Sequence, residues 1–291
     1  MRFSSLRGFL QVVQGGFFLK REVTQVWWVR WEATGEPRGL YMAIMIKTPL
    51  EIEKMRRSGQ VVREVLDHVR KFVKPGASTL DLENAAVEKI EELGARPAFK
   101  GYRGYPCVLC TSINDEVVHG IPSKKRVLKD GDIVSIDTGV IIDGYYGDSA
   151  TTIAVGARVP EKTKKLLEVT QASLESGIQA IKPGATLGDV GAAVQEVVEA
   201  SGFSVVRDFV GHGIGTRLHE DPQVPNYGHR GQGQKLRAGM VIAIEPMVNA
   251  GGPDVQVLSD GWTAVTQDGS LSAHFEHTVA VTAEGAEILT E

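Results

Sequence analysis

The chain has 291 residues, a formal net charge of −4 at pH 7 and a hydrophobic content of 42%. This length suits one large or two small globular domains, and the weak charge excludes a strong field for polyanions such as nucleic acids. No run of 18 apolar residues occurs, which argues against a membrane-spanning helix. The two cysteines cannot form a disulfide framework, so we expect a reducing, cytoplasmic location.

The first 41 residues differ from the rest in composition, because they hold three of the four tryptophans and no aspartate. A short apolar stretch at residues 8–13 suggests a signal peptide, although nearby glutamines weaken that interpretation. Two alternatives are an extension that packs on the main domain and an upstream segment outside the natural protein, whose translation would begin at Met42. We expect an N-terminal segment at residues 1–41 and the main domain at residues 42–291.

Helix signals come in two pairs. Residues 48–51 combine a capping threonine, a proline at the first helical position and a glutamate that completes a capping box. Helical spacing of apolar residues follows, and Pro75-Gly76 is expected to end this helix. A second helix should begin at residue 78 or 79 and stop at Gly94. Residues 161–181 and 186–200 predict an equivalent pair.

Short β-branched runs follow each helix pair and predict strands. They lie at residues 133–136, 151–155, 241–244 and 278–282.

An internal repeat explains this ordering. The sequence of residues 73–77 returns in residues 181–185, and residues 128–137 match residues 236–245. Both offsets are 108 residues, too long for a solenoid repeat. The pattern predicts an α+β fold made of two duplicated half-domains with pseudo-two-fold symmetry, in which helices cover a curved antiparallel sheet.

Two carboxylates hold equivalent positions in the repeat, each at the predicted end of an apolar strand. Burying Asp137 or Glu245 is costly unless the charge is paired or bound to a metal. The alternative is a solvated side chain at a strand end. Because the repeat places both at the same point of each half, we expect the symmetry to bring them to one central site.

Other candidate ligands surround this pair. Asp148 follows Asp137 across a predicted hairpin at residues 143–144, Glu276 opens the last long strand, and His212 lies in a glycine-rich segment. Four carboxylates and one imidazole balance the charge of two divalent ions and differ from a single zinc site of His and Cys. The set favours Mn, Fe, Co or Zn in a bridged pair.

Two further histidines are candidates for catalysis. His-Gly-Ile occurs at His119 and again at His212, once in each half. His219 is followed by Gln223 rather than a second histidine, which excludes the His-Glu-x-x-His zinc helix. Histidine can polarise a carbonyl or donate a proton near neutral pH, although a structural role is the alternative for each.

The Cys107-x-x-Cys110 pair could be a redox pair or half of a zinc site. Residues three apart on an extended chain point to opposite faces, which disfavours a disulfide, and the chain has no second cysteine pair. Residues 211–215 lack the fingerprints of nucleotide-binding loops.

Taken together, these motifs resemble type I bacterial methionine aminopeptidases of peptidase family M24, from about Met42 to Glu291. The matching segments are residues 114–122, 134–137, 147–149, 211–215, 218–220, 244–247 and 274–277.

The resemblance implies the pita-bread fold and two divalent metal ions, drawn from Co, Mn, Fe, Zn and Ni. Asp137 would hold one ion, His212 and Glu245 the other, and Asp148 and Glu276 both.

It also implies a methionine pocket, with His119 and His219 contacting the substrate at the scissile bond and Glu245 carrying a proton to the leaving amine. The implied pocket residues are Phe99, Tyr102, Tyr105, Cys110, Leu218 and Trp262. Phe99 stands where some relatives carry a cysteine, so fine specificity is open.

The implied activity is removal of the initiator methionine from nascent proteins and peptides, preferably before a small second residue. We expect a cytoplasmic monomer that acts on nascent N-termini, with the ribosome as a candidate partner and no membrane or nucleic-acid contact. The alternatives are a proline-specific aminopeptidase or dipeptidase of the same fold, and a non-enzymatic binding module on that fold.

Overall fold

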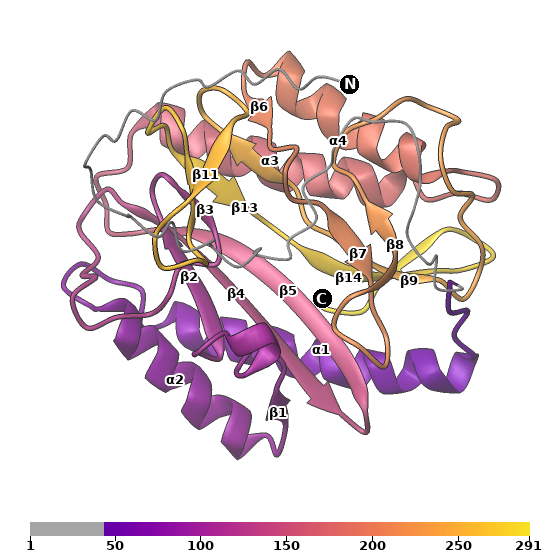
Figure 1. The fold of residues 1–291 in the computed structure, drawn as a ribbon, viewed down its shortest axis with the longest axis horizontal. Coiled ribbons are helices and arrows are strands. Elements are labelled where there is room, and N and C mark those ends of the chain that lie inside the picture. Colours follow the sequence, from indigo (N-terminus) through magenta and orange to yellow (C-terminus); the bar gives the residue numbers. More distant parts are fainter. Residues whose placement is uncertain (1–43) are drawn as a thin grey trace, which may run out of the picture.

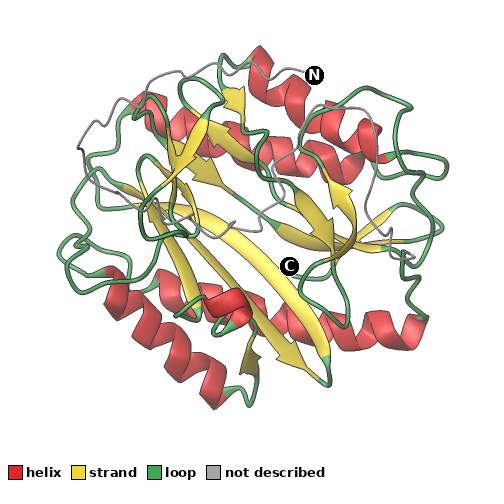
Figure 2. Ribbon diagram, viewed as in Figure 1, coloured by secondary structure: helices red, strands yellow, loops and turns green. Residues whose placement is uncertain are grey.

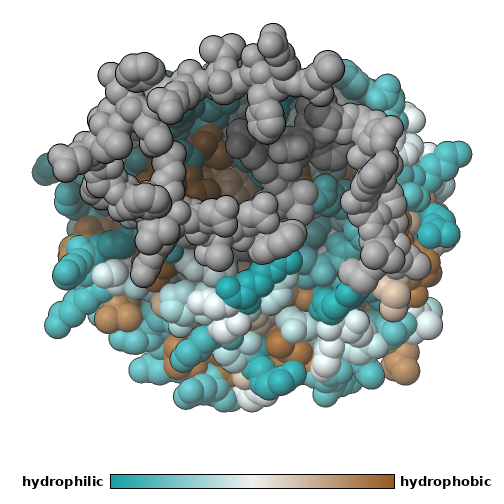
Figure 3. Space-filling model, viewed as in Figure 1, coloured by the Kyte–Doolittle hydropathy of each residue, from teal (hydrophilic) through white to brown (hydrophobic). Residues whose placement is uncertain are grey.

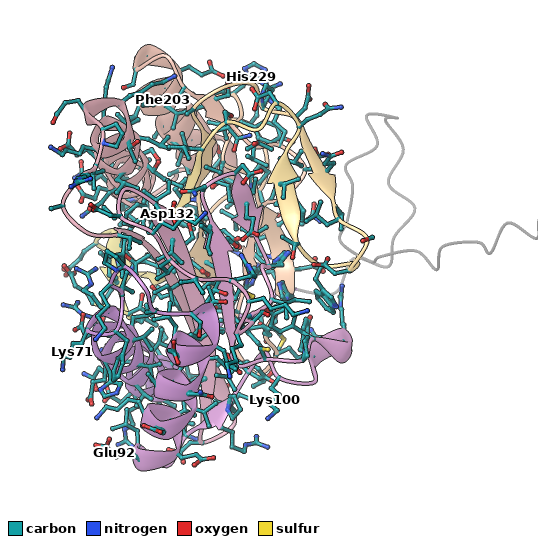
Figure 4. The ribbon with its side chains drawn as sticks, turned by 90° about the vertical axis from the view of Figure 1, so that its left-hand side faces the viewer. Lys71, Glu92, Lys100, Asp132, Phe203 and His229 are labelled. Carbon is teal, nitrogen blue, oxygen red and sulfur yellow. The ribbon has the colours of Figure 1, made fainter. Side chains whose placement is uncertain are left out.

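A computed structural model describes residues 44–291, so the predictions for residues 1–41 lie outside the described part. Two pairs of helices flank the strands on opposite edges of the view (Figures 1 and 2). In the side view the helices gather on one side of the molecule, and Lys71 and Glu92, at the C-terminal ends of α1 and α2, point outward (Figure 4). The helices are α1 (Pro49–Arg70), α2 (Thr79–Glu92), α3 (Glu161–Gln179) and α4 (Leu187–Ala200).

The predicted helix starts are confirmed by capping boxes. Thr48 caps α1 and exchanges hydrogen bonds with Glu51, and Ser78 caps α2 in the same way. Helix α1 ends at Arg70, earlier than the predicted stop at Pro75-Gly76. After Arg70 the chain continues in 3₁₀-type turns, in which the amides of residues 71–73 donate to carbonyls three residues earlier.

Every strand pairing in residues 44–291 is antiparallel, and hydrogen bonding divides the strands into four sheets. The first contains β1 (Arg96–Pro97), β4 (Ile133–Ile142), β2 (Leu109–Ile113) and β5 (Tyr145–Ala154). The second runs β15 (Ala286–Ile288), β14 (His277–Val281), β9 (Val241–Ile244), β7 (Gly211–Gly213), β8 (Glu220–Val224). One small sheet has the strand order β13 (Ser272–His274), β10 (Met247–Asn249) and β6 (Ser204–Val205). The other has the order β11 (Val255–Val257), β12 (Ala264–Thr266) and β3 (Glu116–Val118).

The β4–β5 hairpin corrects one detail of the sequence analysis. Strand β4 continues to Ile142, so Asp137 lies within the strand rather than at its end, opposite Ala150 of β5. The predicted turn at Asp143 and Gly144 is confirmed, since both residues have positive φ angles, 51° and 81°. Such a turn suits the twist of a two-residue hairpin. The prediction for β9 is confirmed without change.

Matching hydrogen bonds confirm the duplication. In the first half the amide of Leu128 donates to the carbonyl of Ala77 over 2.8 Å, and in the second half Leu236 donates to Ala185 over 2.9 Å. The isolated bridge between Ser78 and Val127 has its counterpart between residues 186 and 235. All these pairs keep the offset of the sequence repeat, so the two halves share one backbone plan.

Each half has its own core. One apolar cluster packs α1 and α2 against β4 and β2, and another packs α3 and α4 against β9 and β14. A third cluster, with Met55, Tyr105 and Leu218, lies where the halves meet. Apolar patches on the described part of the face in Figure 3 are scattered among hydrophilic residues. None of the helices within residues 44–291 is both long and apolar enough to cross a bilayer.

Candidate active site

A cavity of about 250 Å³ opens between the two halves, and every predicted site residue lines it. Its acidic end is built by the two large sheets. Asp137 comes from β4, Asp148 from β5 and His212 from β7, while Glu245 directly follows β9 and Glu276 directly precedes β14. The repeat therefore brings the two halves' equivalent carboxylates, residues 137 and 245, to one cavity.

The acidic end holds a compact set of donor atoms. One donor atom each from Asp148, His212 and Glu276 lies within 4.8 Å of the others. The Nε2 atom of His212 is 4.0 Å from Asp148 Oδ2 and 3.5 Å from Glu245 Oε1. The Asp137 and Asp148 carboxyl groups are close enough for each to shift the pKa of the other. These atoms are close enough for shared cations.

Hydrogen bonds fix the backbone of these residues, and those of Thr278 and Ser149 run between the two halves. Thr278 Oγ1 donates to the Asp148 carbonyl over 2.8 Å and accepts from the Asp148 amide over 3.2 Å. Ser149 Oγ donates to the carbonyl of Glu276 over 2.5 Å. Asn226 Nδ2 donates to the carbonyl of Glu245 over 3.1 Å. The acidic side chains thus project from a cross-linked frame.

Burial makes this acidic set costly without cations. It raises the pKa of Asp137 to about 7. Burial also raises the pKa of Asp148, and the neighbouring charges of Glu276 and Asp137 add to the rise. The pKa values of Glu245 and Glu276 are raised for the same two reasons.

Three buried carboxylate oxygens without a hydrogen-bond partner in residues 44–291 show that these residues fit divalent metal ions. Asp137 Oδ1, Asp148 Oδ1 and Glu276 Oε1 are buried and have no hydrogen-bond partner among the described residues. Buried oxygens in folded proteins almost always have a partner, and a bound cation would be a partner for all three. Carboxylate oxygens with one imidazole are suitable donors for divalent first-row metals.

His212 is held in a state ready to bind a metal. Its Nδ1 lies 2.9 Å from the Gly213 carbonyl oxygen, which can only accept, so the ring proton sits on Nδ1. The lone pair of Nε2 therefore faces the carboxylates. Burial lowers the pKa of His212 to about 4 and keeps the ring neutral.

The other two predicted histidines lie beside this cluster. The His219 ring lies 4.1 Å from that of His212, and its Nδ1 is 2.9 Å from the hydroxyl of Tyr102. His119 has a positive φ of 61°, a backbone conformation that few non-glycine residues adopt. Its ring meets the Phe209 ring edge-on at 5.6 Å. Burial lowers the pKa of both histidines, that of His119 to about 4.

The opposite end of the cavity is aromatic and apolar. Tyr105 packs edge-on against Trp262 at 5.0 Å and donates its hydroxyl to the Leu109 carbonyl over 2.8 Å. Cys110 is a buried free thiol, whose pKa burial raises, and Cys107 is also free. Phe99, Tyr102 and Leu218 complete the predicted pocket. This lining suits a flexible apolar side chain.

Sequence reasoning missed several residues around the site. The Nε2 atom of buried His274 is 3.8 Å from Glu245 Oε2 and lacks a hydrogen-bond partner within the described chain. Its position two residues before Glu276 could have drawn attention to it. Phe209 also lines the cavity. Glu220 lines the cavity as well, and it forms a buried ion pair with Lys47, for which the sequence holds no local signal.

Comparison with known proteins identifies relatives over most of the chain. The model of metallopeptidase family M24 matches residues 53–283. A methionine aminopeptidase of Clostridium acetobutylicum is 53% identical over 247 residues, which cover 85% of this chain and 98% of the relative. A crystal structure of the Thermotoga maritima methionine aminopeptidase is 54% identical, with a TM-score of 0.84, and covers 85% of this chain and 99% of its own.

A prolidase structure from Pyrococcus horikoshii is more distant. It is 24% identical with a TM-score of 0.68, and the match covers 84% of this chain but 63% of that one. This likeness shows a shared fold alone. The comparisons confirm the pita-bread fold and the divalent-metal chemistry of a metallopeptidase. The chain therefore belongs to metallopeptidase family M24 and groups with its methionine aminopeptidases.

Proposed function

We propose that the chain removes N-terminal methionine with the help of two divalent metal ions bound at the acidic end of the cavity. The observation that carries this proposal is the convergence of five metal-ligand side chains, three with orphaned buried oxygens, beside an aromatic pocket. The charges of the four carboxylates balance those of two divalent ions.

The ligands divide between the two ions. Asp137 would hold one ion, His212 and Glu245 would hold the other, and Asp148 and Glu276 would be shared by both. The shared role of Asp148 and Glu276 is supported by their approach, since a donor atom of each lies within 4.8 Å of the other. The Asp148 carboxyl also interacts with the charges of both Glu276 and Asp137. When bound, the ions supply Lewis acidity, which lowers the pKa of water and polarises a carbonyl group.

The protein's own residues handle the protons. Glu245 would carry a proton to the leaving amine, because its carboxylate lies at the acidic end of the cavity, with Oε1 3.5 Å from His212 Nε2 and Oε2 3.8 Å from His274 Nε2. The Tyr102 hydroxyl can donate to Nδ1 of His219, which leaves the ring proton on Nε2. From Nε2, His219 donates to the oxygen of the scissile carbonyl. His119 holds the peptide nitrogen from the other side.

The apolar end selects the side chain that is removed. Phe99, Tyr105, Cys110, Leu218 and Trp262 offer a pocket in which methionine loses its contact with water. Methionine is unbranched and polarizable, and its sulfur packs well against aromatic edges.

Several finer features complete the proposal. The substrates are nascent proteins and peptides with a small second residue. The enzyme works in the cytoplasm as a monomer, close to the ribosome where its substrates emerge.

Two peptides and two histidine variants test this function. Metal-stripped protein is titrated with Co, Mn, Fe, Zn or Ni and assayed with Met-Ala-Ser and Ala-Pro. We expect metal to restore methionine release and Ala-Pro to remain intact. His212→Ala should abolish release, while the control His229→Ala, at an exposed position outside the cavity lining and at the upper edge of the molecule in Figure 4, should match the wild type. Release that survives metal removal, or preferential cleavage of Ala-Pro, would refute the proposal.

A further inference from the structure

A buried ion pair joins the segment before α1 to the loop that carries His219. Lys47 Nζ lies 2.7 Å from Glu220 Oε2, and the two side chains are only 5% and 1% exposed. A buried pair is a poor source of net stability, because removing both charges from water costs about as much as their attraction returns. Net stabilisation is therefore a weak explanation for this buried pair.

Glu220 also holds the backbone of the loop at residues 215–219, which carries His219. Its Oε1 accepts hydrogen bonds from the backbone amides of Thr216 over 2.9 Å and Arg217 over 3.2 Å. Glu220 directly follows His219 and begins β8, which pairs with the strand that carries His212. One carboxylate therefore holds both ends of the short loop that presents Leu218 and His219 to the cavity.

Lys47 is itself anchored from a second side. Its amide donates to the carbonyl of Gly239 over 2.7 Å, in the turn before β9, and the indigo segment before α1 runs up beside this part of the molecule (Figure 1). A side chain on Gly215 would lie 2.6 Å from Lys47 Cε and 2.9 Å from a Glu220 oxygen. This close approach explains why the last residue of the Gly-His-Gly-Ile-Gly motif has no side chain.

We propose that Lys47 is a positioning residue, which fixes the His219 loop through Glu220 and so aligns Leu218 and His219 with the substrate. The inference rests on the proposed function, since it assigns Lys47 a part in the same reaction. Lys47 does not line the cavity. Lys47 acts by connecting two parts of the site. Its side chain pairs with Glu220 in the His219 loop, and its amide bonds to Gly239 in the turn before β9, the strand that leads to Glu245.

The test compares Lys47→Met with Lys47→Arg and with a matched control. Misplacing a catalytic group by about 1 Å can cost about 100-fold in rate. We expect kcat for Met-Ala-Ser to fall about 10- to 100-fold in Lys47→Met, with a smaller change in KM and with the Kd for Mn²⁺ within about threefold of wild type. Lys47→Arg should recover most of kcat. The control Lys89→Met, which removes a surface ion pair with Glu92, should leave all three values unchanged.

If Lys47→Met does not fold, the double variant Lys47→Met/Glu220→Gln removes both buried charges, and we expect its kcat to stay at least about fivefold low.

Normal kcat in folded Lys47→Met, or in the double variant, overturns the role of Lys47. Wild type and Lys89→Met are assayed alongside. If neither of them releases methionine, the proposed function fails instead, so the two failures can be told apart.

Discussion

Metal binding should expel protons from the acidic cluster, and their number can be worked out from the site. Burial raises the pKa of Asp137 to about 7, so at pH 6 this carboxyl is about nine-tenths protonated in the metal-free protein. Asp148, Glu245 and Glu276 also have raised pKa values. Because a carboxyl must lose its proton to bind a metal, saturating metal should release at least about one proton at pH 6.

The histidine ligand does not add to this count. The pKa of His212 is lowered to about 4, so its ring is already neutral at pH 6 in the metal-free protein. The sign of the pH effect follows. Metal affinity should rise with pH below about 7, by about tenfold per pH unit for each proton released, and the Asp137 contribution should fade above pH 7.

Isothermal titration calorimetry with Mn²⁺, in buffers of different ionisation enthalpy, measures the released protons directly. Asp137→Asn should lower the count at pH 6 by about one, since the amide cannot titrate. The control Asp143→Asn, at the exposed hairpin turn, should leave the count unchanged. Binding without proton release at pH 6 would refute the reasoning, because the buried carboxylates would then be ionised before metal arrives.

Three further predictions concern two residues beside the cluster and one close packing contact of α1. His274→Leu should weaken Mn²⁺ binding about tenfold in the same titration, because the ring faces Glu245 and outer residues of metal sites commonly carry such effects; unchanged affinity would contradict this. Thr278→Val should lower the free energy of unfolding by about 1–3 kcal/mol in urea, since both its hydrogen bonds to Asp148 are lost. Gly59→Ala should destabilise by about 2 kcal/mol or more, because the new methyl group would lie 1.9 Å from a carbonyl of the C-terminal segment; a wild-type melting curve would count against the packing described.

Much of the fold and of the acidic cluster could be predicted, because the signals for them lie in short sequence motifs or in the internal repeat. Capping boxes mark the starts of α1, α2 and α4 within four residues each. The repeat offset paired Asp137 with Glu245 without any knowledge of tertiary structure. Burial in one cavity follows once the two halves are related by symmetry.

Other features depend on contacts that no local pattern encodes. Strand β4 was predicted to end at Asp137 because a charge usually ends an apolar strand, yet pairing with β5 carries it on to Ile142. A glycine such as Gly139 also usually weakens a strand. Here it lies within β4 because a side chain at this position would lie only 2.9 Å from the Phe99 ring. The pairing of Lys47 with Glu220 spans 173 residues. Only the folded chain reveals such partners.

Crystals grown with Mn²⁺ and measured at a wavelength of strong manganese anomalous scattering would test the proposed metal centre most directly. The account predicts two anomalous peaks in the cavity, both in contact with Asp148 and Glu276, one also with Asp137 and the other with His212 and Glu245. A fully loaded crystal with a single peak, or with peaks away from these five side chains, would contradict it.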